Sequence, residues 1–298
     1  MRWNQRTILI VIAAVLVLTV VALSSTRMDF TGSAGYYPVK VNGKYGFVDH
    51  AGKVVITPQF DQAGDYDDGL APVAMGQRWG YVDRHGKLAI APQFEMADPF
   101  SDDVALVGVG HRLGYINKDG KYLINPQFEG AGRFSEGRAP VMLNGRWGYM
   151  DKNARVVITP QFDEAGSFSD GMAFVRLGDK YGFINKDGKI VINPQWDGVG
   201  EFSDGLALVQ TAGKYGFIDK DGKYAVNPQF EEAGDFSDGV AAVKMNGRYG
   251  YIDKRGKFVI NPQFEQAGEF SHGIAPVWIG DRQGYINKDA KFVWNPTT

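Results

Sequence analysis

The chain is built from an internal repeat. Proline recurs with a constant step of 34 residues, without insertion or deletion, at Pro58, Pro92, Pro126, Pro160, Pro194, Pro228, Pro262 and Pro296. A unit of this length is too short to bury a hydrophobic core by itself, so such units become stable by stacking on their neighbours. The repeat therefore predicts a series of equivalent stacked units, and it overrides the two ordinary domains that a length of 298 residues would suggest.

Other residues keep the same step. Gln and then an aromatic residue follow the first seven prolines, from Gln59-Phe60 to Gln263-Phe264. We expect these Gln side chains to satisfy buried backbone groups. A second column consists of glycines that each precede Phe or Tyr: Gly46, Gly80, Gly114, Gly148, Gly182, Gly216, Gly250 and Gly284.

Each unit contains the signals of β-strands and tight turns. Alternating apolar residues flank Asn144-Gly145, a pair that favours a type I′ hairpin turn because both central residues need positive φ. Where glycine comes first, as in Gly110-His111 and Gly178-Asp179, we expect a type II′ turn. A second turn, such as Asn117 to Lys121, predicts a type I turn closed by a glycine with positive φ. The third strand should end at the proline, which cannot donate a hydrogen bond to a neighbouring strand.

These elements predict a three-stranded β-meander in each unit, followed by an 11-residue connector such as Gln127 to Gly137. The chain enters its first meander at Tyr37 and leaves its eighth at Trp294. The predicted fold class is all-β, with tandem 34-residue β-meander repeats that form an open β-solenoid or superhelix. A closed propeller-like ring is the alternative. We favour the open form because four-stranded propeller blades usually need about 40 to 50 residues.

The N-terminal segment differs from the repeats. Arg2 and Arg6 precede an unbroken apolar run from Ile8 to Leu23, which is typical of a signal anchor or a signal peptide. The sequence therefore divides into this transmembrane or signal helix at 1–25, a linker at 26–35 and eight β-repeats at 36–298. The positive-inside rule places the repeats outside the cytoplasm. We expect a single-pass protein of the cell membrane, with a secreted or periplasmic protein as the alternative if the segment is cleaved.

The repeated segment resembles a known family. Residues 215–223 read Tyr-Gly-Phe-Ile-Asp-Lys-Asp-Gly-Lys and are followed by Pro-Gln-Phe, a pattern similar to the WG-containing repeat family of bacterial proteins, also called KWG repeats. The namesake pair stands at Trp79-Gly80 and Trp147-Gly148, whereas Leu113-Gly114 and Gln283-Gly284 depart from it. The resemblance covers about residues 36 to 296. It implies a β-repeat module with a binding function, and it supplies no catalytic motif.

Composition and charge favour no catalytic or metal chemistry. Lys plus Arg (32) and Asp plus Glu (34) nearly cancel, so we expect no nucleic-acid partner. The chain has no Cys, and its four His lie in different columns of the repeat, so we predict no metal site and no cofactor. Acidic residues form two columns, from Asp61 to Glu265 and from Asp68 to Asp238. Equivalent carboxylates do not provide the unlike pair that a glycosidase needs, so we expect the turn acids to cap backbone N–H groups and predict no catalytic residue.

Aromatic side chains are the candidate ligand-binding residues. They are the residues that precede the repeated glycine, and a row of Trp and Tyr suits sugar rings or a peptide. These candidates are Tyr45, Trp79, Trp147, Tyr181, Tyr215 and Tyr249. A basic column that runs from Lys53 to Lys291 suits a track for phosphate or another polyanion. We favour a solvated face instead, whose charge the nearby acidic columns balance and which protects sheet edges.

The sequence thus predicts a non-enzymatic, extracytoplasmic repeat scaffold that binds a protein or a cell-envelope glycan, with the membrane as a further partner through the N-terminal helix. Two alternatives stay open. One is a hydrolase that acts on polysaccharide, and the other is a purely structural spacer that holds a partner away from the membrane.

Overall fold

A computed structural model describes residues 36–48, 53–270, 273–280 and 282–294. This part of the chain is all-β and consists of antiparallel sheets in which sequential strands are neighbours. Contacts divide it into two compact units. The first unit contains residues 36–48, 53–213 and 217–224, and the second contains 214–216, 225–270, 273–280 and 282–294.

The sheets of the first unit follow the chain in order. The first sheet has β1 (Tyr37–Val41), β2 (Lys44–Val48) and β3 (Val54–Phe60). The second has β4 (Gln62–Ala63), β5 (Leu70–Met75), β6 (Arg78–Asp83) and β7 (Leu88–Phe94). The third has β8 (Met96–Ala97), β9 (Val104–Val109), β10 (Arg112–Asn117) and β11 (Tyr122–Phe128). The fourth has β12 (Gly130–Ala131), β13 (Ala139–Leu143), β14 (Arg146–Met150) and β15 (Val156–Phe162). The fifth has β16 (Glu164–Ala165), β17 (Met172–Leu177), β18 (Lys180–Asn185) and β19 (Ile190–Trp196).

The remaining sheets have the same order of strands. The sixth, where the division between the units falls, has β20 (Gly198–Ser203), β21 (Leu206–Thr211), β22 (Lys214–Ile218) and β23 (Tyr224–Phe230). The seventh has β24 (Glu232–Ala233), β25 (Val240–Met245), β26 (Arg248–Asp253) and β27 (Phe258–Phe264). The eighth has β28 (Gln266–Ala267), β29 (Ile274–Ile279), β30 (Arg282–Asn287) and β31 (Phe292–Trp294).

The three-stranded meander predicted for each unit is therefore wrong. Seven of the described sheets have four strands, because part of each connector pairs with the next meander. This part has two residues in six of the sheets and comprises Gly198–Ser203 in the sixth sheet. In the third sheet Met96 pairs with Gly108 and Ala97 with Val107. A strand of two residues carries no alternation that a sequence pattern could reveal. It also lets four strands fit into 34 residues, which removes the length argument against propeller-like blades.

The repeated proline does not end its strand either. In the second sheet Trp79 pairs with Phe94 and Tyr81 with Ile90, so that Gly80 alone faces the three residues between Ile90 and Phe94. The bulged strand, which includes Pro92, presses its backbone against this glycine. A Cβ atom on Gly80 would lie 2.4 Å from the Ile90 carbonyl oxygen, and this is the reason why the column contains only glycine.

The hairpin turns agree with the sequence except at Gly110-His111; Gly178 (φ 62°) has the positive φ of the predicted type II′ turn, and Asp179 does not have positive φ. Asn144 (φ 54°) and Gly145 (φ 76°) both have the positive φ of the predicted type I′ turn. Gly110 (φ 58°) and His111 (φ 64°) also both have positive φ, so the type II′ turn predicted there is wrong. In the second turn Gly120 has the predicted positive φ of 76°.

The core lies between successive sheets. Ile90 and Phe94 of the second sheet pack with Ala105 and Val107 of the third in one buried cluster. An aromatic pair recurs at six of these contacts, with ring centroids 4.7 to 4.9 Å apart. These pairs are Phe47–Tyr66, Tyr81–Phe100, Tyr115–Phe134, Tyr149–Phe168, Phe183–Phe202 and Tyr251–Phe270.

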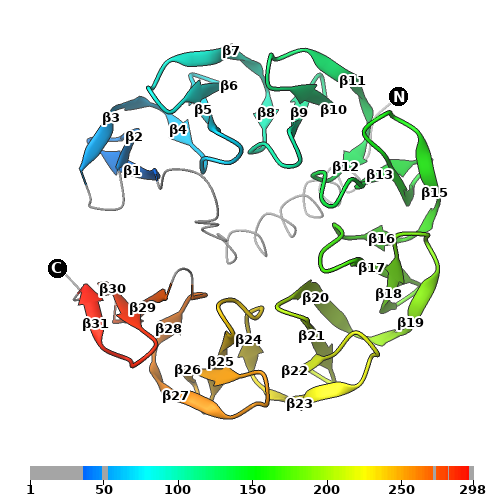
Figure 1. Cartoon of the computed structure of the whole chain (residues 1–298), viewed down its shortest axis with the longest axis vertical. Helices are drawn as coiled ribbons and strands as arrows, with labels where there is room; N and C mark the ends of the chain where they lie inside the picture. The colour runs from blue at the N-terminus through cyan, green and yellow to red at the C-terminus, as the bar shows by residue number, and fades with distance from the viewer. Residues whose placement is uncertain (1–35, 49–52, 271–272, 281, 295–298) are drawn as a thin grey trace, which may run out of the picture. The chain divides into compact units, whose positions relative to one another are not determined.

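Within the first unit, the sheets follow one another along an arc (Figure 1). The two-residue strands β4, β8, β12 and β16 lie on its concave side, and the seven-residue strands β7, β11, β15 and β19 lie on its convex side. The predicted N-terminal helix at 1–25 and linker at 26–35 lie outside the described residues. Among the residues that are described, no helix has the length and apolar character needed to span a membrane.

Candidate functional site

The acids of the second column link neighbouring sheets. Asp170 has a positive φ of 54°, and its Oδ2 accepts a hydrogen bond from the backbone N–H of Gly205, one sheet further on, at 2.8 Å. Lys220 Nζ of that later sheet donates to the Asp170 carbonyl oxygen at 2.7 Å. The same carboxylate contact joins Asp238 to Gly273. These acids therefore cap backbone N–H groups as the sequence predicts, and the caps lie between sheets.

The acids of the first column close the hairpins. Asp197 accepts hydrogen bonds from Lys180 Nζ at 2.5 Å and from the backbone N–H of Ala212 at 2.8 Å. The Lys180 ammonium, followed by the Ala212 N–H, holds the pKa of Asp197 below its usual value. Equivalent ion pairs join Lys44 to Asp61, Arg78 to Glu95, Arg112 to Glu129, Arg146 to Asp163 and Arg248 to Glu265. The carboxylates of both columns thus serve the fold.

On one face of each four-stranded sheet, three residues on neighbouring strands are paired in register. We call these three residues the cross-strand row. They come from the short first strand, from the second strand, and from the position before the repeated glycine. In five sheets the register gives Gln62–Ala74–Trp79, Met96–Gly108–Leu113, Gly130–Met142–Trp147, Glu164–Arg176–Tyr181 and Glu232–Lys244–Tyr249. In the eighth it gives Gln266–Trp278–Gln283, and in the sixth it begins Gly198–Gln210.

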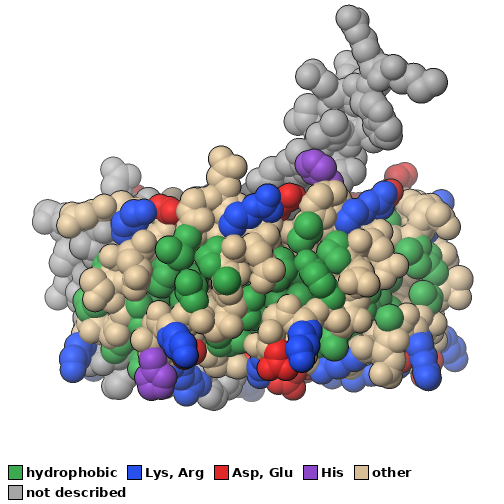
Figure 2. Space-filling model, turned by 90° about the horizontal axis from the view of Figure 1, so that it is seen from above, with side chains coloured by type: hydrophobic (Ala, Val, Ile, Leu, Met, Phe, Trp, Pro, Cys, Tyr) green, Lys and Arg blue, Asp and Glu red, His purple; other side chains and the backbone are tan. Residues whose placement is uncertain are grey.

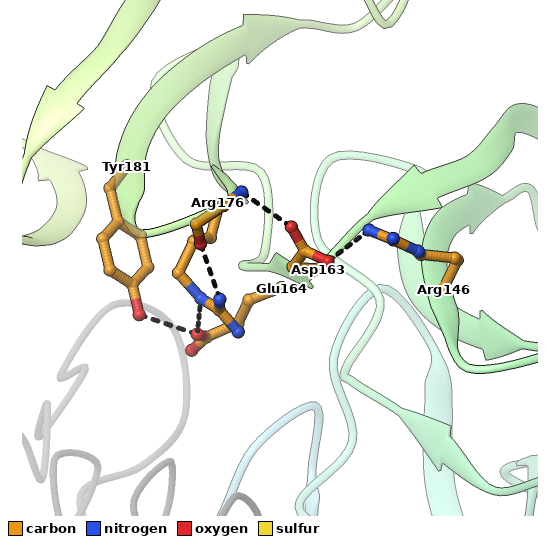
Figure 3. Close-up of polar contacts among 6 residues, drawn as sticks. Arg146, Asp163, Glu164, Arg176 and Tyr181 are labelled. Carbon is orange, nitrogen blue, oxygen red and sulfur yellow. Dashed lines mark hydrogen bonds and ion pairs between the residues drawn. The ribbon is translucent and has the colours of Figure 1, made fainter.

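The row of the fifth sheet forms a charged cluster (Figure 3). Glu164 Oε2 accepts hydrogen bonds from Tyr181 Oη at 2.7 Å and from Arg176 Nε at 3.1 Å. Burial, and then the hydrogen bond to Glu164, raises the pKa of Tyr181 to about 12. Beside this cluster, Asp163 binds Arg146 of the preceding sheet and the backbone N–H of Gly178.

The seventh sheet repeats this cluster with lysine in place of arginine. Glu232 accepts hydrogen bonds from Lys244 Nζ at 2.6 Å and from the Tyr249 hydroxyl. These two donors, Lys244 first, lower the pKa of Glu232. Lys244 Nζ also lies 5.4 Å from the centre of the Tyr249 ring, within the range of a cation–π contact.

The six candidate aromatic residues are the third members of these rows or their equivalents. Tyr45, Trp79, Tyr181, Tyr215 and Tyr249 are half-buried, and Trp147 is buried, with 9% of its surface exposed. The Trp147 ring lies over the first strand of its own sheet, because a Cβ atom on Gly130 of that strand would lie 3.1 Å from the ring. The aromatic edges that remain exposed belong to a mixed polar and apolar surface.

Sequence reasoning found the third member of five of the seven rows and missed the other two members of each row. The first member lies on a strand of only two residues, so its pairing could not be predicted. One signal was present, however. Glu164 and Glu232 are each followed 12 residues later by a basic residue and 17 residues later by a tyrosine, a coincidence that other units lack.

The other candidate chemistries find no cluster. His85 and His111 are exposed, and His50 and His272 lie outside the described residues. Within the described ranges, no group of three or more His, Cys, Asp or Glu side chains gathers where it could hold a metal ion.

Solved structures with the same fold are distant in sequence. A crystal structure of a eukaryotic initiation factor aligns with a TM-score of 0.59 at 12% identity, over 89% of this chain and 85% of that chain. The dihydro-heme d1 dehydrogenase NirN, in complex with DHE, aligns with a TM-score of 0.57 at 14% identity, over 91% of this chain and 76% of that chain. Structural relatives of this kind are propeller or repeat proteins, and at such low identity they show the fold alone.

No curated protein matches the sequence. The sequence pattern of the WG containing repeat, in contrast, matches residues 45–79, 79–110, 114–147, 147–181, 181–215, 215–249 and 249–281. The matched segments cover most of the chain and share its 34-residue step. The chain therefore belongs to the WG containing repeat family.

Proposed function

We propose that this chain is a non-enzymatic repeat scaffold that works outside the cytoplasm and binds a protein or a cell-envelope glycan over an extended surface. The cross-strand row carries the proposal. It occupies the same place in successive sheets, yet its chemistry changes from one sheet to the next. Its second member is buried in the second and third sheets and partly exposed from the fourth sheet onward. Its second member alone is Ala74, Gly108, Met142, Arg176, Gln210, Lys244 or Trp278.

The contrast with the rest of the repeat supports this function. The glycines, prolines and interface aromatics stay nearly constant because the fold requires them, whereas the row has no such constraint. A surface that differs from sheet to sheet suits a partner whose own surface differs along its length, as a folded protein's does. The six candidate aromatics contribute to this surface through their exposed edges.

The absence of catalysis is part of the proposal. An acid–base pair needs two carboxylates in unlike environments. The described acids of each column instead repeat one environment, with backbone N–H groups and Lys or Arg side chains as partners in successive sheets. Burial raises the pKa of Asp65, but its neighbouring charge is Arg133 and not a second carboxyl group.

The location rests on the N-terminal sequence. Arg2 and Arg6 before the apolar run from Ile8 to Leu23 support an anchor or signal with the repeats on the far side of the membrane. Fusion of reporters to the C-terminus tests this. A periplasmic alkaline phosphatase reporter should be active and a cytoplasmic fluorescent reporter dark, and the reverse result would contradict the proposal.

We also propose that the repeats form an open array. Each sheet repeats the contacts of the last, which suits addition of sheets along a line as well as around an axis. Small-angle scattering of the chain distinguishes the two. An open array predicts a larger radius of gyration than a closed ring of the same mass, and a ring-like scattering profile would refute it.

The binding experiment uses the full chain in detergent, with an envelope extract and a glycan array as sources of partners. Its test variant replaces Met142, Arg176, Lys244 and Trp278 by alanine. Ala74 occupies the equivalent place in the second sheet, so alanine is compatible with the fold there. We expect this variant to remain folded and to lose capture of the partner that the natural chain retains.

The other two functions are outcomes of the same experiment. Turnover of a polysaccharide by the natural chain would favour a hydrolase. Failure to retain any protein or glycan would favour a structural spacer. Equal capture by the natural chain and the alanine variant would show that the row is not the binding surface.

A further inference from the structure

A second surface carries similar residue types in successive sheets, whereas the residue types of the cross-strand row differ from sheet to sheet. The last strand of each sheet begins with two neighbouring apolar residues that are both exposed in most sheets, such as Val156 (48% exposed) and Val157 (39%) in β15. In β19 the pair is Ile190 (36%) and Val191 (45%). We call these pairs, together with the exposed Gln of the same strands, the outer belt. In Figure 2, which looks onto the edge strands β7 and β11, a band of apolar side chains runs between margins of Lys and Arg.

Ring contacts link the belt of one sheet to the preceding sheet. The ring of Tyr122 at the start of β11 contacts that of Phe94 at the end of β7, with centroids 6.3 Å apart. In the second unit, Phe258 contacts Phe230 in the same way, also at 6.3 Å. At these sheets, and at Tyr224, whose hydroxyl lies 3.3 Å from Trp196 Nε1, the first residue of the pair adjoins the end of the preceding sheet's last strand. The belt therefore extends from one sheet to the next at these places.

One margin of the belt carries cations, most of which form no close ion pair among the described residues; Lys223, which pairs with Asp221 at 3.5 Å, is an exception. A Lys or Arg directly precedes each apolar pair, and the side chains of Lys87, Lys121, Arg155 and Lys189 are exposed. Within the described part of the chain, none of these four forms an ion pair. The opposite margin carries the basic residues that pair with the acids of the hairpins, as Arg112 does with Glu129.

The belt also carries the repeated glutamine. The side chains of all seven Gln that follow the prolines are exposed, so the prediction that they satisfy buried backbone groups is wrong. Gln161 Nε2 donates only a long bond of 3.3 Å to the exposed Thr159 carbonyl oxygen, which contributes little to stability. Other surface positions of these repeats differ from sheet to sheet, as the second member of the cross-strand row does. An exposed residue that stays Gln in seven copies therefore points to a function of the surface.

Protection of sheet edges explains only part of this pattern. Lysine and proline on an edge strand do hinder aggregation, but exposed apolar pairs on the same strand promote it. A second copy of the chain does not fit, because its belt carries the same unpaired cations. The partner must therefore be anionic, must accept apolar contact, and must offer groups that bind amides.

We propose that the outer belt binds a linear acidic glycan, a polymer of uronic acid sugars that contacts one equivalent patch on each successive sheet. The proposal rests on the scaffold function above and names its ligand class. The cations bind the carboxylates, the Gln amides bind hydroxyl groups, and the apolar pairs contact the C–H faces of the sugar rings. A repeating ligand suits a repeating surface, because each weak contact raises the effective concentration for the next.

The test measures binding of oligogalacturonates by the full chain in detergent, with short chains that reach one sheet and longer chains that reach several. We expect the affinity to rise at least about tenfold from short to long chains and to fall with added salt. The belt variant replaces Lys87, Lys121, Arg155 and Lys189 by Gln, and we expect it to bind the long chains at least about tenfold more weakly.

A matched control replaces Arg78, Arg112, Arg146 and Lys180 by Gln, which makes the same change in net charge on the opposite margin. It should bind within about twofold of the natural chain, because these residues already have acidic partners. Equal weakening by the two variants, no dependence on chain length, or binding of anionic lipid vesicles in place of the glycan would overturn the proposal. Capture of a protein through the cross-strand row would survive those results, so the scaffold function can hold when the belt proposal fails.

Discussion

At the scale of single residues, the repeated glycines and prolines belong to one structural feature, in which the bulged strand that contains the proline packs against the glycine. Each of these positions requires glycine, because the bulged backbone around the proline of the next strand occupies the space where a Cβ atom would lie. This relation could not be read from the sequence. The column was visible there, but the bulge appears only once the register on both sides of it is known.

Gly250→Ala should lower the free energy of unfolding by about 2 to 3 kcal/mol, since the new Cβ would lie 2.5 Å from the Ile260 carbonyl oxygen. Gly234→Ala is the control. Its Cβ would meet nothing closer than Glu269 Oε1 at 3.8 Å, and the change should stay within about 0.5 kcal/mol. Urea denaturation measures both, and similar losses in the two variants would contradict the steric account.

Ala154 occupies a turn position where most units have glycine. Its φ is +61°, a conformation that costs an L-residue about 1 kcal/mol relative to glycine. Ala154→Gly should therefore raise the free energy of unfolding by about 1 kcal/mol. The reverse change, Gly188→Ala, should destabilise, because its Cβ would also meet Ile158 at 2.9 Å. Thermal denaturation compares the pair, and a less stable Ala154→Gly variant would disprove this reasoning.

The lowered pKa of a hairpin carboxylate predicts that the folded state loses stability in acid. The pKa of Asp197 is lowered from its ordinary value of 3.8, so the folded state prefers the charged form. Its contribution to stability is complete above pH 3.8 and is lost as the pH falls through the lowered pKa. Asp197→Asn should make the loss of stability below this pH less steep. Urea midpoints measured across the acid range check this, and identical pH dependence in both proteins would rule it out.

At the scale of the element, the hairpins were predictable and the fourth strand was not. Asn144-Gly145 specifies its turn through the φ angles of two residues, which is local information. The strands β8 and β12 exist because a two-residue segment meets the edge of the following meander, which is tertiary information. The structure places Tyr149 in the contact between sheets, where its ring packs against that of Phe168.

Tyr149→Phe tests that contact. The buried hydroxyl of Tyr149 donates a 2.8 Å hydrogen bond to the Gly166 carbonyl oxygen of the next sheet. Phe183 stands in the same column, so the ring alone fits, and the cost should be about 1 to 2 kcal/mol for the unsatisfied carbonyl. The exposed Tyr122→Phe is the control and should change little. Denaturant unfolding distinguishes them, and an unchanged Tyr149→Phe variant would show that the bond contributes nothing.

At the scale of the whole molecule, the sequence predicted the repeat, its length and its family, because these follow from identity between columns. It predicted the third member of five of the seven cross-strand rows. It also showed the basic and glutamine columns of the outer belt, but it did not show that the apolar pairs of the belt are exposed. The members of the row are known only from the register between strands. The belt is known only once the structure shows which of two equally repeated faces remains exposed. In the sequence, Val156 and Val157 are ordinary strand residues, and the structure shows that they lie on an outer edge strand.

The central claim is that the sheets are interchangeable, joined by the same contacts throughout. Deletion of residues 129–162 removes one whole repeat and joins Phe128 to Asp163, a junction of the same kind as the natural one at Phe162. The contacts of the lost sheet have substitutes, because Asp102 can bond to the Gly171 N–H as Glu136 now does.

The decisive measurement is the equilibrium unfolding of this deletion variant, followed by circular dichroism. The account predicts a folded β-protein with one cooperative transition, whereas deletion of only residues 129–145 should abolish it. A whole-repeat deletion that fails to fold cooperatively, like the half-repeat deletion, would contradict the claim that the sheets are equivalent.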